Sequence, residues 1–590
     1  MKQNKKLWIS ISTAVIITII TVSTLVYFSP YPPRQPKNIA IGDYSYAIDY
    51  TQYKVNKIMK TTKVPSVAVA LIDDQEVIWQ SVDGHANDET KTHATLSIIY
   101  RVGSITKVFT AIEIMRLFED GLLDLDSPIT DFIPDFSINS RFEDNTSITI
   151  RSLLQHHSGL PRNGNLPKWY WDAGVNVLRE LTKSLKYSYT AYPVGYRYKY
   201  SNVGFDILGS IIEILRGDYF VPYMKENILR AIGMNDSTFL AQDIPLTRTL
   251  AVGHVREKRT NLLVNQYDVI NLPSGNLYST IPDMAEFTKF IFRGGFGLED
   301  QLIENTTLQM MFDPLSTTKE DPKSIGLGWH TGLVNNKEKV VYHSGGIQGT
   351  HSLIAFLPER KLGIVLIGNS FEFEGAINQF GWEVLELMLE AKQGFELQDA
   401  QAKEIVSVSL AQIESYVGNY ILDFELTDFF IKSNKLKANA MGTTFKLLPL
   451  SESKFKLKHW LIDFGNIEVE FYPGDEIINK FLIINYDDAS LDFIPAYPSL
   501  DELPASWAKF LGTYDIYPRN ESNYAELGPY GQLDLAFTDN ILMLGSSYYL
   551  QPISDTEIIL LSGPFVYETM IVDFLTGNIY WQNDIFKPIV

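Results

Sequence analysis

Ser104 and Lys107 form a Ser-x-x-Lys element, which could supply a nucleophile and the group that activates it. Residues i and i+3 of a helix share one face, with Cβ atoms about 5 to 6 Å apart, so the ammonium would lie beside the hydroxyl. A helix N-terminus also offers free N–H groups where an oxyanion develops during acyl transfer. The pattern alone is weak evidence, because an N-cap serine followed by an exposed lysine would look the same. It also begins at Ser316, Ser451, Ser453 and Ser506.

The surroundings of Ser104 separate it from the other four matches. A strand-like run and a glycine, Arg101-Val102-Gly103, come directly before it. After it, apolar residues recur at helical spacing as far as Phe118, and Gly121 follows as a stop signal. The sequence therefore predicts a helix over residues 104–118 with Ser104 and Lys107 in its first turn.

Two further elements carry suitable chemistry. Tyr200-Ser201-Asn202 follows 96 residues after Ser104, and His343-Ser344-Gly345 follows 143 residues after that. A tyrosine with a pKa of about 10 is a poor base, but an ammonium 4 Å away supplies about 4 kcal/mol at an effective dielectric near 20, or about three pKa units. Lys107 would keep Tyr200 partly ionised or share its proton, and either residue could be the general base. The Asn202 amide would orient Lys107.

In this order, the three elements resemble the serine β-lactamase and penicillin-binding protein superfamily, in particular its class C β-lactamase-like branch of peptidases, esterases and lactamases. The resemblance covers roughly residues 45–390 and includes the stretches 153–160, 326–329 and 343–350. It implies a catalytic set and an oxyanion hole formed by the N–H groups of Ser104 and Gly346, with Gly345 beside them, and it implies no cofactor. The catalytic set would be Ser104, Lys107, Tyr200, Asn202 and His343.

His343 departs from the usual pattern of the lactamases and transpeptidases. Those enzymes usually carry lysine at this place, where a fixed positive charge meets the carboxylate of the substrate. Histidine is largely neutral above about pH 6.5. Its presence puts efficient β-lactam hydrolysis in doubt and resembles the peptidase and esterase members of the branch.

Composition excludes several other classes of function. The net charge is -20 and no basic stripe is present, which argues against nucleic-acid binding. The chain has no cysteine, so disulfides, thiolate metal sites and a cysteine nucleophile are excluded. His156 and His157 are adjacent rather than at metal-ligand spacing, and no catalytic metal is predicted.

The N-terminal region predicts a membrane anchor. Residues 7–28 carry no charge, and 22 residues are enough for a helix to cross a hydrocarbon core about 30 Å thick. Lys2, Lys5 and Lys6 precede this stretch, so the positive-inside rule places the N-terminus in the cytoplasm and the rest of the chain outside. No small-residue cleavage site follows, which favours an uncleaved anchor over the alternative of a secreted protein with a cleaved signal.

The chain is long enough for several domains. We expect a stub and anchor at 1–29, a Pro-rich linker at 30–40, and a hydrolase domain at 41–395. In the hydrolase domain a hairpin over 66–82 joins a meander over 340–367 in one antiparallel sheet, flanked by helices, with the Ser104 helix buried against it. The fold class is thus α+β, followed by a β-rich domain at 405–500. Residues 501–590 form a second such domain or the remainder of the first, and both look lipocalin-like.

Three functions are compatible with these features. The first is an extracytoplasmic hydrolase of D-amino-acid peptides, amides or esters that works through an acyl-enzyme. The second is a true β-lactamase, and the third is a binding or sensor module in which Ser104 never turns over. The expected partners are a small-molecule or peptide substrate and the membrane, and the oligomeric state is left open.

Overall fold

The computed structural model describes residues 32–588 apart from several short segments. The segments left out are 143–145, 165–176, 258–259, 265–267, 315–323, 335–336, 348, 397–405, 423–424, 441–442, 459–466, 474–479, 487–488, 498–502, 519–530, 539–540, 546–547, 562–567, 573–578 and 582–583. The predicted anchor, residues 7–28, lies outside the described residues. In the described part of the chain, no helix is both long enough and apolar enough to cross a membrane.

A seven-stranded antiparallel sheet organises the first part of the chain, in the order β4-β3-β2-β12-β11-β10-β9. The predicted hairpin is β2 and β3, and the predicted meander is β10, β11 and β12. Strand β12 pairs with β2, which joins the two groups as expected. The strands are β2 (Ser66–Asp73), β3 (Glu76–Asn87), β4 (Thr92–His93), β9 (His330–Val334), β10 (Glu338–Ile347), β11 (Thr350–Leu357) and β12 (Leu362–Gly368).

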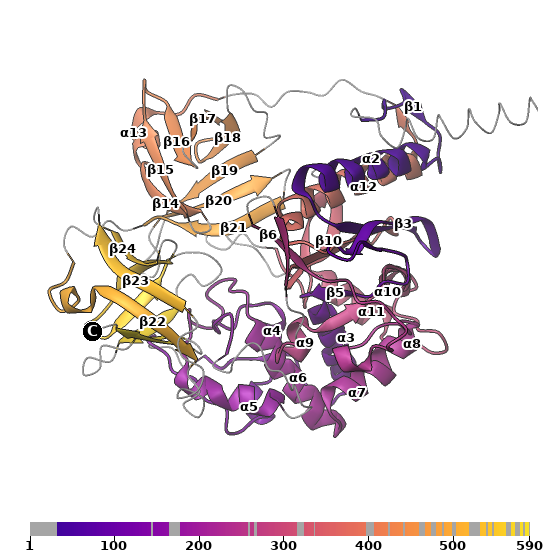
Figure 1. Ribbon diagram of the computed structural model, residues 1–590, viewed down its shortest axis with the longest axis horizontal. Helices are drawn as coiled ribbons and strands as arrows, with labels where there is room; N and C mark the ends of the chain where they lie inside the picture. Colours follow the sequence, from indigo (N-terminus) through magenta and orange to yellow (C-terminus); the bar gives the residue numbers. More distant parts are fainter. Residues whose placement is uncertain are drawn as a thin grey trace, which may run out of the picture.

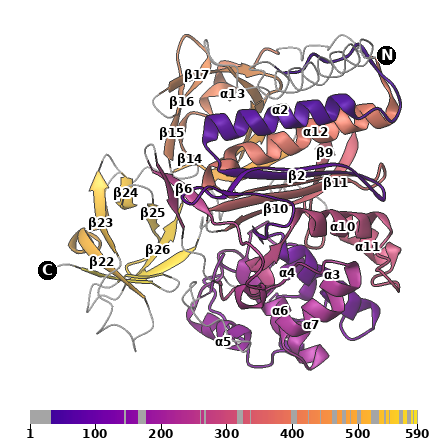
Figure 2. The same ribbon diagram turned by 45° about the vertical axis from the view of Figure 1, so that its right-hand side comes forward.

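Helices cover both faces of this sheet (Figure 2). The central strands β2, β11 and β12 are therefore mostly apolar and almost entirely buried, because neither face meets water. On one face lie α2 (Ser45–Thr62) and α12 (Glu374–Gln393), and on the other lies α10 (Ile281–Phe292). The α+β fold class is confirmed.

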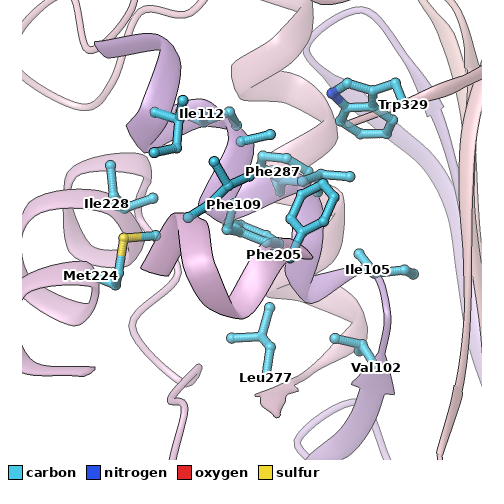
Figure 3. Close-up of a cluster of buried hydrophobic side chains, with 14 of the residues drawn as sticks. Val102, Ile105, Phe109, Ile112, Phe205, Met224, Ile228, Leu277, Phe287 and Trp329 are labelled. Carbon is cyan, nitrogen blue, oxygen red and sulfur yellow. The ribbon is translucent and has the colours of Figure 1, made fainter. Parts of the chain in front are cut away.

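Helix α3 (Thr106–Glu119) contains Lys107 and is buried, as predicted. It packs mainly against α6 (Asn202–Arg216) and α9 (Leu272–Gly275) rather than against the sheet, which α10 covers. Figure 3 shows α3 side chains packed against those of neighbouring elements. The Phe109 ring lies 4.3 Å from the Phe287 ring of α10, between centroids. Burial of aromatic rings on this scale stabilises a helix more than its intrinsic propensity does. The cluster includes Val102, Ile105, Phe109, Ile112, Phe205, Met224, Ile228, Leu277, Phe287 and Trp329.

The C-terminal part is mainly β, as predicted, and holds two eight-stranded sheets that lie beside each other (Figure 1). In the first sheet the strands follow chain order from β14 (Gly418–Leu422) to β21 (Ala489–Pro495), and a bridge between Tyr420 and Ala496 brings its two ends together. The second is a closed barrel from β22 (Gly512–Pro518) to β29 (Asp584–Pro588). Closure leaves no edge strand exposed to another chain.

The two β units begin alike, with the similar sequences Tyr-Val-Gly-Asn-Tyr at 416–420 and Phe-Leu-Gly-Thr-Tyr at 510–514. Gly418 and Gly512 open β14 and β22 with φ of +146° and +149°, values that favour glycine. Two residues later, Tyr420 and Tyr514 donate hydrogen bonds from their hydroxyls to the carbonyls four residues before them. A glycine with positive φ followed by a tyrosine that hydrogen-bonds back to the chain therefore begins each β unit.

Candidate active site

Ser104 lies in the turn between strand β5 (Tyr100–Gly103) and helix α3. Strand β5 pairs with β8 (Leu277–Ser279) and ends at Gly103, whose φ of +53° turns the chain sharply. The helix begins at Thr106, two residues later than predicted. The hydroxyl of Thr106 donates to the Gly103 carbonyl at 2.6 Å and accepts from the Leu277 N–H at 3.0 Å, which fixes the turn.

Lys107 is fully buried and connects three parts of the site. Its Nζ lies 3.3 Å from Ser104 Oγ, 2.7 Å from Asn202 Oδ1 and 2.7 Å from the Ser274 carbonyl oxygen. A buried amine keeps such a position only where oxygen atoms accept its protons. The sequence prediction that Asn202 orients Lys107 agrees with this geometry.

Tyr200 and Asn202 stand at the beginning of helix α6 (Asn202–Arg216). The helix starts here because the Ser201 hydroxyl accepts from the Gly204 N–H at 3.0 Å, as an N-cap. The Asn202 side-chain amide donates to Asn163 Oδ1 at 2.9 Å while its oxygen accepts from Lys107. The Tyr200 ring centroid lies 4.7 Å from Lys107 Nζ. The Ser-x-x-Lys and Tyr-x-Asn elements thus meet, as predicted.

The protonation of Tyr200 differs from one of the two expectations for it. Burial raises the pKa of Tyr200 to about 12, although the charge of Arg162 and a hydrogen bond with Ser104 oppose the rise. Of the two alternatives that the sequence left open, this pKa disfavours a partly ionised Tyr200 and leaves a proton shared with Lys107. Desolvation penalises a buried phenolate more than the nearby charges stabilise it. Tyr200 is a neutral hydroxyl group at pH 7 that can pass a proton to or from Ser104.

Residues of the segment 156–163 contact the Tyr-x-Asn element and hold it in position. The His156 carbonyl accepts from the Lys199 N–H at 2.7 Å, and the Nδ1 atom of His156 accepts from the Ser201 N–H at 3.1 Å. The His156 ring lies 4.4 Å from the Tyr200 ring, between centroids. Burial and the charge of Lys107 hold the pKa of His156 well below its usual value, so the ring is neutral. His156 therefore positions the element.

His343 is buried in β10, close enough to Lys107 for the charge of that lysine to act on its ring. Its Nδ1 lies 2.7 Å from the Ser344 carbonyl oxygen, so Nδ1 carries the proton and Nε2 is free of one. Burial and the charge of Lys107 lower the pKa of His343 to about 3. His343 is therefore uncharged at neutral pH and supplies no fixed cation for a substrate carboxylate.

The buried neutral state of His343 predicts loss of stability in acid. Between pH 6.5 and pH 3 the unfolded chain binds a proton here that the folded chain does not, so the free energy of unfolding falls as the pH falls, by up to about 1.4 kcal/mol per pH unit. His343→Gln is expected to flatten this slope in urea titrations between pH 4 and 7. An unchanged slope in the variant would contradict the assignment.

Gly345 and Gly346 place β10 against the backbone that leads into Ser104, and a Cβ on Gly103 would lie 2.9 Å from the Gly346 nitrogen. A Cβ on Gly345 would lie 2.0 Å from the Val102 carbonyl oxygen and 3.0 Å from the Ser104 nitrogen. A Cβ on Gly346 would lie 2.7 Å from His351 Nε2. Only glycine permits this approach. The predicted oxyanion donors, the N–H groups of Ser104 and Gly346, therefore belong to adjoining stretches of backbone.

Two residues of the site were not predicted. The Ser274 carbonyl holds Lys107, and Asp206 lies on α6 one turn after Asn202, fully buried. Burial raises the pKa of Asp206 to about 7, while hydrogen bonds from Asn271 and Ser274 and the charge of Lys107 lower it. A single carboxylate inside the apolar run 203–212 was a detectable signal, because such a group is rarely buried without a partner. A backbone carbonyl leaves no such trace in a sequence.

Residues 52–382 match the family model described as Beta-lactamase, which covers more than half of the chain. The chain belongs to the beta-lactamase family. Protein flp of Staphylococcus aureus (strain MW2) is 25% identical over 309 residues, which are 52% of this chain and 60% of that protein. Beta-lactamase-like protein 2 of Dictyostelium discoideum is 25% identical over 348 residues, 56% of this chain and 62% of that protein. The chain thus spans about three fifths of the length of these curated relatives.

Solved structures share the beta-lactamase family fold. The octameric penicillin-binding protein homologue from Pyrococcus abyssi has a TM-score of 0.52 and 24% identity, covering 76% of this chain and 99% of that one. SurE has a TM-score of 0.53 and 19% identity, covering 77% of this chain and 99% of that one. In both comparisons the matched part of this chain is longer than the segment 41–395, so the match includes part of the C-terminal β region.

Proposed function

We propose that this beta-lactamase family member is a serine hydrolase that forms an acyl-enzyme on Ser104 and cleaves D-amino-acid peptides, amides or esters. The observation that carries the proposal is the contact of Lys107 Nζ with Ser104 Oγ at 3.3 Å and with Asn202 Oδ1 at 2.7 Å. In its unprotonated form Lys107 can take the proton of the Ser104 hydroxyl as the oxygen attacks a carbonyl. The transfer is either direct or through the neutral Tyr200 hydroxyl, which gives its own proton to Lys107 as it receives that of Ser104. The same pair would then activate water to release the acyl group.

The neutral state of His343 supports amides and esters over β-lactams as substrates. With its pKa near 3, His343 offers no positive charge to a β-lactam carboxylate. The guanidinium carbon of Arg162 lies 4.9 Å from the Tyr200 ring centroid. A D-amino-acid acyl group is the first to test, because one SurE structure was determined with D-Leu.

The location proposed for the enzyme is the outer side of the cell membrane. The uncharged stretch 7–28 and the lysines before it support a single anchor with a cytoplasmic N-terminus. Proline residues at 30, 32, 33 and 36 favour an extended spacer between the anchor and the first domain. Release after signal cleavage is the alternative.

A substrate panel tests the proposed substrate class. The purified full-length protein is expected to hydrolyse D-phenylalanine amide or its methyl ester faster than the L-enantiomers, and to hold a penicilloyl adduct while consuming little drug. Ser104→Ala serves as the control in each assay. Rapid consumption of penicillin, with no turnover of the D-substrates, would favour a true β-lactamase. Full biological activity of Ser104→Ala would favour a non-hydrolytic binding module.

A further inference from the structure

Glu568 is a buried carboxylate of the C-terminal barrel that contacts the hydrolase part of the chain. It directly precedes β27 (Thr569–Val572) and is 2% exposed. Its Oε1 accepts from the Arg162 N–H at 2.7 Å and lies 3.4 Å from Lys199 Nζ, a lysine whose side chain is 7% exposed. A buried carboxylate needs such partners because its desolvation is costly. Both partners belong to the beta-lactamase part of the chain.

The two partners of Glu568 adjoin both residues of the Tyr-x-Asn element. The Arg162 carbonyl accepts from the Asn202 N–H at 2.8 Å, and the Arg162 guanidinium lies over the Tyr200 ring. Lys199 directly precedes Tyr200, and its own N–H is held by the His156 carbonyl. Glu568 therefore contacts Arg162, the residue whose carbonyl holds the Asn202 N–H and whose guanidinium faces the Tyr200 ring.

The barrel is held in this position by more than one contact. Arg141 donates to Thr569 Oγ1 at 3.1 Å and to the Ala191 carbonyl at 3.2 Å. A buried apolar cluster also joins all three parts of the chain, with Ala191 and Tyr192 from the hydrolase part, Ile421, Phe481 and Tyr497 from the first β unit, and Tyr549, Ile559 and Leu561 from the barrel. These contacts fix the barrel, and with it Glu568, against the hydrolase part of the chain.

We propose that Glu568 is a positioning residue through which the C-terminal barrel fixes Arg162 and Lys199, and through them Tyr200 and Asn202. The proposal rests on the proposed function and goes beyond it, because it makes the barrel part of the active site. Burial lowers the pKa of Lys199, while the charge of Glu568 opposes that change. Loss of this support would slow chemistry more than substrate binding.

Kinetics of Glu568 variants in the full-length protein test the proposal. Glu568→Ala is expected to lower kcat for p-nitrophenyl acetate by about 10- to 100-fold with KM changed less than threefold, as for a small displacement of catalytic groups. Glu568→Gln keeps an oxygen acceptor for the Arg162 N–H and should restore most of kcat. Asp555→Asn, an exposed barrel carboxylate, is the matched control. A kcat for Glu568→Ala within twofold of the parent would overturn the proposal.

A double variant covers the outcome in which Glu568→Ala fails to fold. Glu568→Leu with Lys199→Met removes both buried charges at similar volume but still leaves the Arg162 N–H without its acceptor. The proposal predicts the same loss of kcat in this folded protein, and a parental kcat would overturn it.

Hydrogen exchange gives a readout that does not depend on activity. The Arg162 amide should be protected in the parent and in Asp555→Asn, and exposed in Glu568→Ala. Equal protection in all three would also overturn the proposal. If the parent itself reacts with no substrate, the proposed function is wrong, and the exchange data alone decide whether Glu568 holds Arg162.

Discussion

Lys107→Met is expected to lower kcat for ester hydrolysis by about 10³- to 10⁵-fold, the range seen when a member of a catalytic unit is removed. Methionine has nearly the length of lysine but cannot donate to Ser104, Asn202 or the Ser274 carbonyl, all of which contact Nζ. Ser104 would then lose the unprotonated amine that takes its proton, and with it the ammonium formed by that transfer, which stabilises the anionic tetrahedral intermediate. Steady-state and single-turnover rates with p-nitrophenyl acetate measure the effect.

Folding must be controlled in this experiment, because the variant leaves three buried oxygen acceptors without a donor. The thermal unfolding midpoint of Lys107→Met should therefore be measured beside its rate. Lys60→Met, in the exposed last turn of α2, is the matched control and should keep parental kcat. A folded Lys107→Met protein with kcat within tenfold of the parent would contradict the role given to Lys107.

Tyr200→Phe is expected to lower kcat by about 10²- to 10⁴-fold, the usual contribution of a positioned proton-transfer group. Phenylalanine keeps the ring that lies against His156 and Arg162 but removes the hydroxyl that hydrogen-bonds with Ser104. Because the pKa of Tyr200 is about 12, its hydroxyl acts in the neutral form over the working pH range. The acyl-enzyme should form slowly and persist, which stopped-flow and mass measurements can follow.

The control for this prediction is Tyr196→Phe. Tyr196 lies in the same loop, with its ring 5.6 Å from that of Tyr192, between centroids, and it packs against the buried cluster shared with the C-terminal β units. It should leave both steps nearly unchanged. Equal acylation and deacylation rates in Tyr200→Phe and the parent would exclude Tyr200 from proton transfer and leave Lys107 as the sole base.

Sequence patterns predicted the parts of the fold that depend on local chemistry. The strands over 66–82 and 340–367 follow from short apolar runs broken by turns, and the observed register of β2 with β12 joins them. The meeting of Ser104, Lys107, Tyr200 and Asn202 was also predicted, because their residue types, in this order along the chain, resemble the motifs of a known hydrolase family. The exact start of α3 was missed, since the turn at Gly103 depends on β10 packing against it.

Other properties of the site depend on the assembled fold. The pKa of Tyr200 rises because burial outweighs the neighbouring charges, and no spacing along the chain gives that balance. Glu568 stands 406 residues after Arg162, so nothing in the local sequence connects them. The support for the Tyr-x-Asn element becomes visible only when the barrel lies against the hydrolase part.

The most direct test of the central claim is the intact mass of the full-length protein during reaction with p-nitrophenyl acetate and with penicillin, followed by peptide mapping. The account predicts one covalent acyl group, carried by Ser104, on the parent protein and none on Ser104→Ala. An adduct of equal yield on Ser104→Ala, or no adduct on the parent with either reagent or with a D-amino-acid ester, would contradict it.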